Sequence, residues 1–287
     1  MAKTIPNALY VVATPLGNLG DISARAIEIL STVSVIYAED TRHSGRMLQS
    51  IGIDTALRSL HEHNEEHRIE EVLTRIADGE AIALISDAGT PCISDPGYRL
   101  VRATRAAGLR VLTVPGPCAA IAALSIAGLP TDRFLFVGFL PQRQSARTRA
   151  LAALAQEPGT LVLYESPRRI RSLLDELHAA LGERQVAVAR ELTKLHEEVI
   201  WGTLGQLSPA SIHPRGELTV IVAGATSKRA AATEQQQQLE KLLMAAKTMG
   251  LKQRDAMELA RAVFELPRRE LYATALQIWH EDTAEQP

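Results

Sequence analysis

The sequence predicts an α/β protein made of two α/β domains with a cofactor cleft between them, followed by a small C-terminal helical module. Three observations carry this prediction. Short apolar runs alternate with amphipathic stretches in the first part of the chain, strand patterns become more frequent in the second part, and helical patterns alone fill the last part. We therefore divide the chain into 1–128, 129–225 and 226–287.

The first domain has the pattern of repeated βα units around a mainly parallel sheet. The runs LYVVA, VIYA, AIALIS and LRVLTV are candidate strands, and amphipathic segments separate them. Asp21 is expected to cap the first helix, because its side chain can accept a hydrogen bond from a free backbone N–H. Gly108 is expected to end the helix before the run LRVLTV.

The second domain is predicted to hold a mixed sheet. Its strand candidates TLVLYES, QVAVARELT, EEVIWGTL and ELTVIVAG have only two helical stretches among them, too few for a crossover helix between every pair of strands. The last segment reads as three short amphipathic helices. They resemble a helix-turn-helix module, and a plain helical cap on the second domain is the alternative reading.

Composition excludes several classes of protein. The chain has 287 residues, of which 46% are hydrophobic, and a net charge of −2, so binding to nucleic acid through bulk positive charge is disfavoured. Cys92 and Cys118 are the only cysteines, which leaves no disulfide framework and indicates a reducing compartment. No apolar run reaches the roughly 18 residues that span a bilayer. We therefore expect a cytoplasmic protein without a membrane partner.

Four loops follow strand candidates of the first domain: 13–21, 38–45, 86–97 and 114–120. The carboxyl ends of parallel strands meet at one edge of a sheet, where ligands of such folds bind. Neither a phosphate-binding P-loop nor a GxGxxG fingerprint is present, and the glycine-rich loops hold no obvious anchoring lysine or arginine. The loops therefore suit a neutral or cationic cofactor, and S-adenosylmethionine meets that description.

A metal site is the main alternative for the segment SLHEHNEEHR. It contains His63, Glu66 and His67 in an HxxEH pattern, which needs both histidines on one helix. Asn64 reads as a helix N-cap followed by an acidic first turn, so His63 falls before the helix. We expect no metal. A serine nucleophile is also disfavoured, because Ser86 lies in no GxSxG elbow.

Arginines open both predicted helices of the second domain. Positive charge is unfavourable at a helix N-terminus, so the clusters indicate an external anion such as an RNA phosphate. The alternative is a solvated face whose arginines pair with neighbours such as Glu176. The candidate RNA-binding residues are Arg143, Arg147, Arg168 and Arg169.

The motifs together resemble one family. The resemblance runs from about Leu9 to Gly224 and less distinctively through the tail. The chain resembles the RNA-modifying branch of the tetrapyrrole methylase superfamily. It implies a homodimeric enzyme that uses S-adenosylmethionine to methylate the ribose 2′-hydroxyl of a cytidine in the decoding region of 16S rRNA, presented as naked RNA or in the 30S subunit. The segments that carry the resemblance are ATPLGNLGD, YAEDTRHS, SLHEHNE, LISDAGTPCISDPG, VPGPCAAIAAL, LPTDRFLFVGFLP, LYESPRRI and ARELTKLHEE.

The resemblance also implies which residues hold the cofactor. The superfamily's Gly-Asp-Pro loop matches Gly89-Thr90-Pro91, where threonine replaces aspartate, a departure that fits the RNA-modifying branch. The segments Tyr164-Glu165-Ser166 and Glu217-Leu218-Thr219 match strands that close over the cofactor. The implied cofactor-binding residues are Pro15, Leu16, Asp87, Ala88, Gly89, Pro91, Cys118, Ala119, Tyr164, Glu165 and Leu218.

The acceptor hydroxyl is a poor nucleophile at neutral pH and would gain from a general base. Asp87 and Glu165 are the candidates, with Glu39, Arg42 and Lys194 behind them. Asp87 has an alternative role, in which it only caps its loop or holds the amino group of the cofactor. Two other functions stay open: a methylase of porphyrins or corrins, and a non-catalytic ribosome-binding protein.

Overall fold

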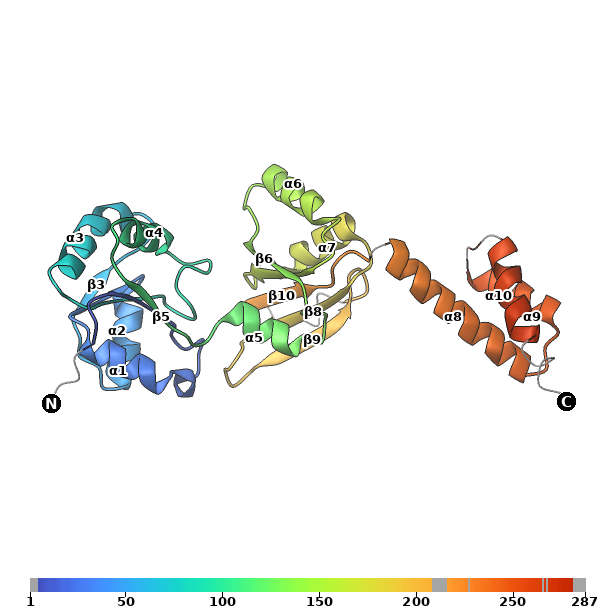
Figure 1. Ribbon diagram of the computed structural model, residues 1–287, viewed down its shortest axis with the longest axis horizontal. Helices are drawn as coiled ribbons and strands as arrows, with labels where there is room; N and C mark the ends of the chain where they lie inside the picture. Colours follow the sequence, from blue (N-terminus) through green and yellow to red (C-terminus); the bar gives the residue numbers. More distant parts are fainter. Residues whose placement is uncertain (1–4, 208–215, 227, 265, 267, 281–287) are drawn as a thin grey trace. The chain divides into compact units, whose positions relative to one another are not determined.

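The computed structural model describes residues 5–207, 216–226, 228–264, 266 and 268–280 (Figure 1). It separates into two compact units, Met1–Ala225 and Thr226–Pro287. The first contains two sheets with their helices, and the described residues of the second form helices and their connections.

The first sheet is entirely parallel, as the alternating pattern predicts. Its strands have the order β3-β2-β4-β1-β5. Because all five run the same way, the loops that follow them lie at one edge. The strands are β1 (Leu9–Val12), β2 (Val35–Ala38), β3 (Leu57–Ser59), β4 (Ile82–Ile85) and β5 (Val111–Val114). The helices are the 3-10 turn Leu19–Asp21, α1 (Ala24–Thr32), α2 (Thr41–Ser50), α3 (Glu65–Ala77) and α4 (Tyr98–Ala106).

Both faces of this sheet are covered by helices. Successive side chains of a strand point to opposite faces. In β1, Tyr10 and Val12 pack with residues of α1 and α2, whereas Leu9 packs with residues of α3 and α4. Figure 1 shows the two layers, with α1 and α2 on one side of the strands and α3 and α4 on the other. The three central strands β2, β4 and β1 are therefore buried on both faces, which explains their continuous apolar runs, whereas the edge strands β3 and β5 are partly exposed.

The predicted ends of two helices have different outcomes. Asp21 does not cap α1, because it lies in the preceding 3-10 turn, and Ser23 is the N-cap instead, accepting a hydrogen bond from the backbone N–H of Ala26 at 3.0 Å. Gly108 follows the last turn of α4 with φ +72°, the left-handed conformation that glycine adopts at helix ends. That prediction is confirmed.

The second sheet is mixed, in the order β6-β7-β10-β8-β9. Strands β6 and β7 are parallel, and the other neighbours are antiparallel. Helices α6 and α7 pack on one face and α5 on the other (Figure 1). The strands are β6 (Phe134–Phe139), β7 (Thr160–Glu165), β8 (Gln185–Arg190), β9 (Glu198–Thr203) and β10 (Leu218–Val222); the helices are α5 (Ala119–Ile126), α6 (Gln144–Leu154) and α7 (Ile170–Leu181). These two sheets confirm the predicted fold class.

Helix α5 belongs to the second sheet by its packing. Ala120, Ala123 and Leu124 share a buried cluster with Val162 and Ile221 of the second sheet. The division at residues 128 and 225 stays a prediction. This packing argues for placing its first boundary before α5 rather than after it.

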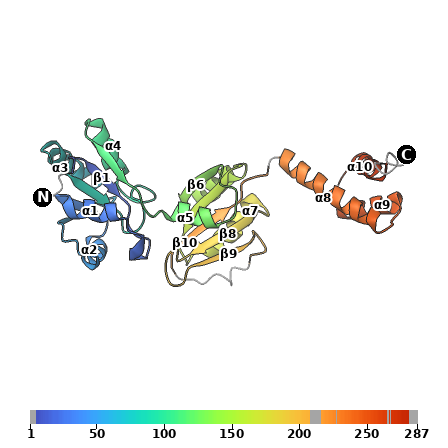
Figure 2. The ribbon, with the colours of Figure 1, turned by 60° about the horizontal axis from the view of Figure 1, so that its bottom comes forward.

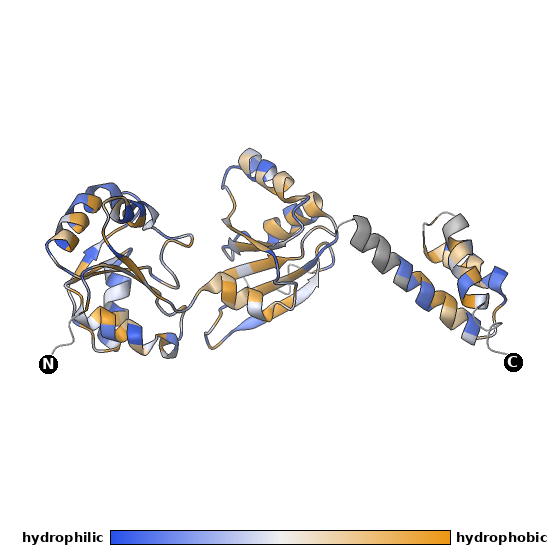
Figure 3. Ribbon diagram, viewed as in Figure 1, coloured by the Kyte–Doolittle hydropathy of each residue, from blue (hydrophilic) through white to orange (hydrophobic). Residues whose placement is uncertain are grey.

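The second unit consists of α8 (Lys228–Thr248), α9 (Gln253–Val263) and α10 (Arg268–His280) (Figure 2). They share a small core that includes Leu239, Leu243, Ala260, Leu271 and Ile278. In Figure 3 most strands of the two sheets are hydrophobic, with β3 and part of β9 as exceptions, whereas the helices show hydrophobic and hydrophilic residues side by side. Among the described helices, none combines the length and apolar character that crossing a bilayer requires.

The loop after β4 has an unusual backbone. Cys92 and Ser94 have φ of 71° and 65°, a conformation that residues with a side chain rarely adopt. Gly97 has φ 121°, and a β-carbon added there would lie 2.5 Å from Cδ2 of Leu84. Glycine is therefore required at this position by conformation and by space.

Replacing Gly97 with alanine is expected to destabilise the first sheet. The left-handed backbone costs about 1–2 kcal/mol for a residue with a β-carbon, and overpacking against Leu84 adds about 1–3 kcal/mol. The free energy of unfolding is measured by urea titration followed by far-UV circular dichroism. Gly108→Ala is the matched control, because φ is +72° there and a β-carbon would meet nothing within 4 Å. Equal losses in the two variants would contradict the clash at Leu84.

Candidate functional site

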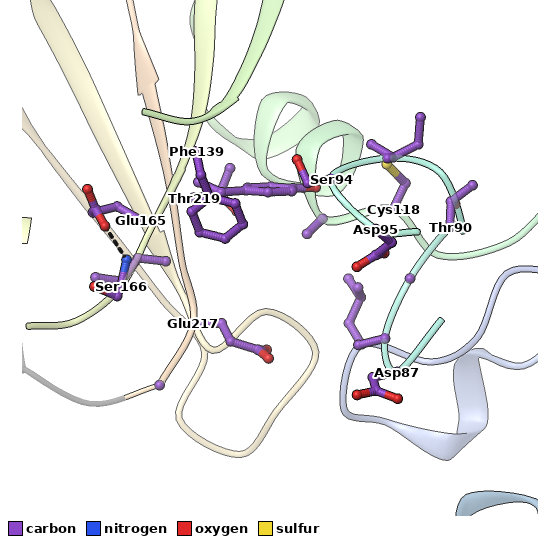
Figure 4. A pocket seen from close by; sticks show the side chains of 18 of the residues that line it. Asp87, Thr90, Ser94, Asp95, Cys118, Phe139, Glu165, Ser166, Glu217 and Thr219 are labelled. Atoms are coloured by element: carbon purple, nitrogen blue, oxygen red, sulfur yellow. Dashed lines mark hydrogen bonds between the residues drawn. The ribbon is translucent and has the colours of Figure 1, made fainter. Parts of the chain in front are cut away.

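A cavity of about 430 Å³ lies between the loops of the first sheet and the strands of the second (Figure 4). Leu16 follows β1, Glu39 follows β2, the segment 87–95 follows β4, and Cys118 follows β5. The opposite wall comes from the ends of β6, β7 and β10. The volume is in the range of sites that hold small molecules.

Most of the predicted cofactor residues line this cavity. Nine of the eleven do so: Leu16, Asp87, Ala88, Gly89, Cys118, Ala119, Tyr164, Glu165 and Leu218. Pro15 and Pro91 are buried and are not among the lining residues. These two prolines shape the loops, and their predicted contact with a cofactor has no support from the cavity. The structure thus brings together loops that lie far apart in the sequence.

The floor of the cavity is built by pairing of the loops after β1 and β4. The backbone N–H of Thr14 donates to the carbonyl of Gly89 at 2.8 Å, and the N–H of Gly89 donates to the carbonyl of Thr14 at 3.1 Å. The hydroxyl of Thr90 donates to the carbonyl of Pro117 at 2.9 Å, which adds the loop after β5. Gly89 has φ +84°, and a β-carbon there would lie 3.2 Å from Cδ2 of Leu16. The three loops therefore form one pinned surface.

Three carboxyl groups gather on the side of the first sheet. Burial, followed by the charges of Glu39 and Asp87, raises the pKa of Asp95 to about 7. Burial and the neighbouring charge of Asp87 also raise the pKa of Glu39. Like charges in a poorly solvated site disfavour ionisation of one another. This side of the cavity is rich in carboxyl groups, with no lysine or arginine among its described lining residues. It suits a cationic ligand, whose charge would favour the ionised carboxylates.

Asp87 is held by the loop after β2. Its Oδ1 accepts a hydrogen bond from the backbone N–H of Asp40 at 3.1 Å. Asp40 in turn caps α2, accepting from the backbone N–H groups of Arg42 and His43. Asp87 therefore connects the loops after β2 and β4 at the edge of the cavity, in agreement with the alternative in which it caps its loop.

Glu165 is an ion-pair residue. Its carboxylate accepts from Nε and Nη2 of Arg169 at 3.0 and 2.9 Å and lies 3.5 Å from Nη2 of Arg147. It also accepts from the backbone N–H of Ser166 at 2.7 Å, the bond drawn in Figure 4. With a side chain that is 1% exposed and two guanidinium partners, this carboxylate is a poor general base. The geometry therefore argues against the predicted catalytic role of Glu165.

Two of the four predicted RNA-binding arginines are engaged inside the protein. Arg147 is 3% exposed and pairs with Glu165 and Glu176, which argues against its predicted contact with RNA. Arg169 is half-buried against Glu165. Sequence pattern could not separate these from Arg143 and Arg168, which are exposed and form no ion pair with any described residue.

The wall from the second sheet is aromatic. The Tyr164 ring lies 5.2 Å from that of Phe136 and 5.5 Å from that of Phe139. The hydroxyl oxygen of Tyr164 accepts from the backbone N–H of Ala120 at 3.0 Å, and burial raises its pKa. Phe139 is 59% exposed beside the cavity (Figure 4). A planar or apolar part of a ligand can pack here.

Lys194 connects the two sides. Its Nζ donates to Glu191 at 2.9 Å and to Glu217 at 3.0 Å, and Glu217 lines the cavity. A β-carbon on Gly17 would lie 2.5 Å from Cγ of Lys194, so the lysine side chain rests directly on the loop after β1. Lys194 therefore holds a cavity carboxylate and packs against the opposite domain.

The histidine segment does not have the geometry of the HxxEH motif. Helix α3 begins at Glu65, so His63 precedes it, as the pattern of caps predicts. Asn64 is the N-cap residue but makes no side-chain bond into the helix; its Oδ1 accepts from the backbone N–H of His61 instead. Within the described part of the chain, no three potential ligand residues cluster as a metal site.

Comparison with known proteins then defines the family. A profile of the tetrapyrrole (corrin/porphyrin) methylases matches residues 8–208. The chain belongs to this family. Similar curated proteins are named ribosomal RNA small subunit methyltransferase I: one from Xylella fastidiosa is 48% identical, covering 93% of this chain and 98% of the relative, and one from Escherichia coli O157:H7 is 45% identical, covering 94% of each.

Solved structures of tetrapyrrole methylases share the fold. The methyltransferase CobJ superposes with a TM-score of 0.58 at 20% identity, over 76% of this chain and 94% of the other. A uroporphyrin-III-C-methyltransferase from Thermus thermophilus gives a TM-score of 0.55, also at 20% identity and over the same shares. Like its family, this protein is a methyltransferase whose methyl donor is S-adenosylmethionine.

The cavity fits this tetrapyrrole methylase cofactor. S-adenosylmethionine carries a positive sulfonium and a positive amino group. The lining includes the carboxylates of Glu39, Asp87 and Asp95 and contains no lysine or arginine among the described residues. At Gly89 the cavity floor is formed by backbone atoms, because this residue has no side chain and packs closely against Leu16.

Sequence reasoning missed Asp95 as a site residue. It lies in the Asp-Pro-Gly turn at the far end of the loop after β4, eight positions beyond Asp87. The sequence of this turn is typical of a simple connection between two elements, but its backbone brings Asp95 back to the cavity. Ser94 and Phe139 were also outside the predicted set of site residues. Phe139 is an uncharged strand residue, and nothing in the sequence distinguishes it from the other apolar residues of β6. Glu217 was named within a strand segment, without a role.

Replacing Glu165 with glutamine is expected to lower stability rather than to remove a catalytic base. Breaking a buried ion pair leaves charge uncompensated and costs about 3–5 kcal/mol. Thermal unfolding measures the loss. Glu183→Gln is the matched control, because Glu183 is exposed and a surface change costs within about 0.5 kcal/mol. Normal stability with abolished turnover would restore the catalytic role.

Proposed function

We propose that this enzyme methylates the ribose 2′-hydroxyl of a cytidine in the decoding region of 16S rRNA. The observation that carries the proposal is the 43–48% identity, over nearly the full chain, to proteins named for methylation of small-subunit ribosomal RNA. The carboxyl-rich cavity that fits a sulfonium supports the same reaction. Exposed arginines on the second domain support an RNA substrate over a small macrocycle.

The cofactor would be held by the pinned loops of the first sheet. When bound, S-adenosylmethionine supplies a methyl group on a sulfonium. Leu16, Ala88 and Gly89 would contact it through the cavity floor, and Asp87 would face its positive groups. Tyr164 and Phe139 would exclude water from the opposite wall. Transfer to an oxygen then depends mainly on holding the acceptor in line and dry.

RNA would be held by its phosphates. Arg143 precedes α6 and Arg168 precedes α7, and both guanidinium groups are exposed. Free cations at helix starts have no favourable interaction with the helix dipole, which is consistent with an external anion. With aromatic residues at 4% of the chain, a base-stacking platform is disfavoured, so recognition of structured RNA through its backbone is the better match.

Homodimer formation and a cytoplasmic location are part of the same proposal. Strand β6 lies at the edge of its sheet and exposes Phe134 and Leu135, at 41% and 38%. Helix α5 exposes Ile121 and Ile126. An uncovered apolar edge strand favours pairing with another chain. A second copy is the partner that the family resemblance implies. Ribosomal RNA would place the enzyme in the cytoplasm.

Transfer of a labelled methyl group tests the function. The enzyme is incubated with labelled S-adenosylmethionine and either naked 16S rRNA or purified 30S subunits that lack the modification. We expect label on the ribose of one cytidine, detected by mass spectrometry of nuclease fragments. A uroporphyrinogen assay runs in parallel. Label on the macrocycle and none on either RNA substrate would support the porphyrin methylase alternative. Cofactor binding without any transfer to RNA or macrocycle would contradict both.

Reversing the charge of Arg168 is expected to weaken RNA binding. The Arg168→Glu variant loses a phosphate contact, so its log-log salt dependence becomes shallower by about one unit, while affinity for S-adenosylmethionine is unchanged. Filter binding at several salt concentrations measures the slope. The control is Arg105→Glu, which changes an exposed arginine of α4 that also lacks an ion pair with described residues. Unchanged RNA affinity in Arg168→Glu would return the arginines to a solvated face.

A further inference from the structure

We propose that Asp95 is the catalytic residue that accepts the proton of the acceptor hydroxyl. The inference rests on the proposed function and assigns a chemical role within it. It begins from the carboxylates that line the cavity, which are Glu39, Asp87, Asp95, Glu165 and Glu217. A general base needs an unshared oxygen that faces the reacting group.

Three of the five carboxylates are already occupied. Glu165 is paired with Arg147 and Arg169, and Glu217 accepts from Lys194 at 3.0 Å. Asp87 accepts from the backbone N–H of Asp40. A carboxylate that already accepts from a cation or a backbone N–H has fewer free lone pairs to offer the acceptor hydroxyl. Asp95 and Glu39 remain.

Asp95 lies on a loop that reaches the second sheet, and Glu39 directly follows β2 of the first sheet. Figure 4 shows the carboxylate of Asp95 directed into the space between the first-sheet loops and the wall that carries Phe139 and Glu217. The positive φ of Ser94 sets the turn before it, and a β-carbon on Gly138 of β6 would lie 2.8 Å from Oγ of Ser94. The loop is thus braced against the second sheet, so Asp95 is positioned by both domains.

The two acidic neighbours of Asp95 both favour its protonated form. Glu39 faces it from the loop after β2, and Asp87 faces it from its own loop. Tyr164 faces it from β7, and Cys92 lies on the same loop. The hydroxyl of Ser86 is the one hydrogen-bonding group that favours the ionised form. A carboxylate in such surroundings titrates near neutral pH, where a general base works best.

The proton balance is simple. As the ribose oxygen forms its bond to the methyl carbon, the bond between that carbon and sulfur breaks, and the sulfur keeps the electron pair and becomes a neutral thioether. The proton of the hydroxyl passes to Asp95. The carboxyl group then releases the proton to solvent through the cavity mouth. The positive charge that the sulfonium brings into the cavity therefore leaves the cavity on this proton.

The test compares Asp95→Asn, Asp95→Glu and wild type over pH 5 to 9 on the RNA substrate that accepts the methyl group. Wild-type kcat/KM for S-adenosylmethionine is expected to fall about tenfold per pH unit below about 7, which is the pKa of Asp95 in the free enzyme. Asp95→Asn is expected to lose about 10²–10⁴-fold in kcat and this pH dependence. Asp95→Glu is expected to recover part of the rate. Asp78→Asn, at an exposed helix end, is the control and is expected to behave as wild type.

Binding separates a proton acceptor from a residue that merely holds the cofactor. We expect Asp95→Asn to bind S-adenosylmethionine more weakly, because one carboxylate of the cavity is lost, and to bind S-adenosylhomocysteine within about threefold of wild type by calorimetry. Its loss in kcat should persist at saturating cofactor. A selective loss of affinity for the sulfonium form, with wild-type kcat at saturation, would overturn the proposal. If wild type methylates the RNA and Asp95→Asn does so at full rate, the inference fails while the function stands. If wild type methylates no RNA, the proposed function fails first.

Thermal stability gives a readout that needs no turnover. A carboxyl whose pKa is raised in the folded protein destabilises it once ionised, from its ordinary pKa near 3.8 up to about 7. The melting temperature of wild type should therefore fall relative to that of Asp95→Asn as pH rises from 4 to 7, and the difference should stay constant above. A difference that does not change with pH would contradict a carboxyl that titrates near neutrality.

Discussion

The reciprocal hydrogen bonds between Thr14 and Gly89 fix the geometry on which the rest of the site depends. They join the loops after two neighbouring parallel strands, and this pairing is possible only because Gly89 adopts a positive φ. Once these loops are joined, Thr90 reaches the loop after β5 and Asp87 reaches the loop after β2. One backbone pairing thus converts four separate loops into a single rigid floor.

The two domains treat acidic residues in opposite ways. In the second domain, Glu165 and Glu217 are neutralised by arginine and lysine. In the first, no arginine or lysine of the described part of the chain forms an ion pair with Glu39 or Asp95, and the pKa values of both are raised, although the charge of His61 partly opposes the shift at Glu39. Burial of unpaired carboxyl groups costs stability, and a folded protein retains that cost at sites of binding or catalysis. The asymmetry identifies the first domain as the side that handles positive charge and protons.

The sequence predicted the fold class well because helix and strand periods are local properties. It also predicted most of the cavity lining, since parallel strands bring their loops to one edge. It could not distinguish Arg147, which is buried between two acids, from the exposed Arg168, because both occur in basic segments at helix starts. Asp95 was missed for a related reason. Asp95 reaches the cavity because Cys92 and Ser94 adopt a left-handed backbone conformation. Cysteine and serine rarely adopt this conformation, so their identity does not predict it.

Arg147 makes three positions of the second domain interdependent. Its guanidinium lies between Glu165 on β7 and Glu176 on α7, and the cluster is largely shielded from water. Loss of the arginine alone would leave two acids facing one another, and loss of one acid would leave excess positive charge beside Arg169. Substitutions at these positions are therefore tolerated as sets rather than singly. Among diverging relatives, the residues at positions 147, 165 and 176 should change together, because their ion pairs hold α6 and α7 against β7.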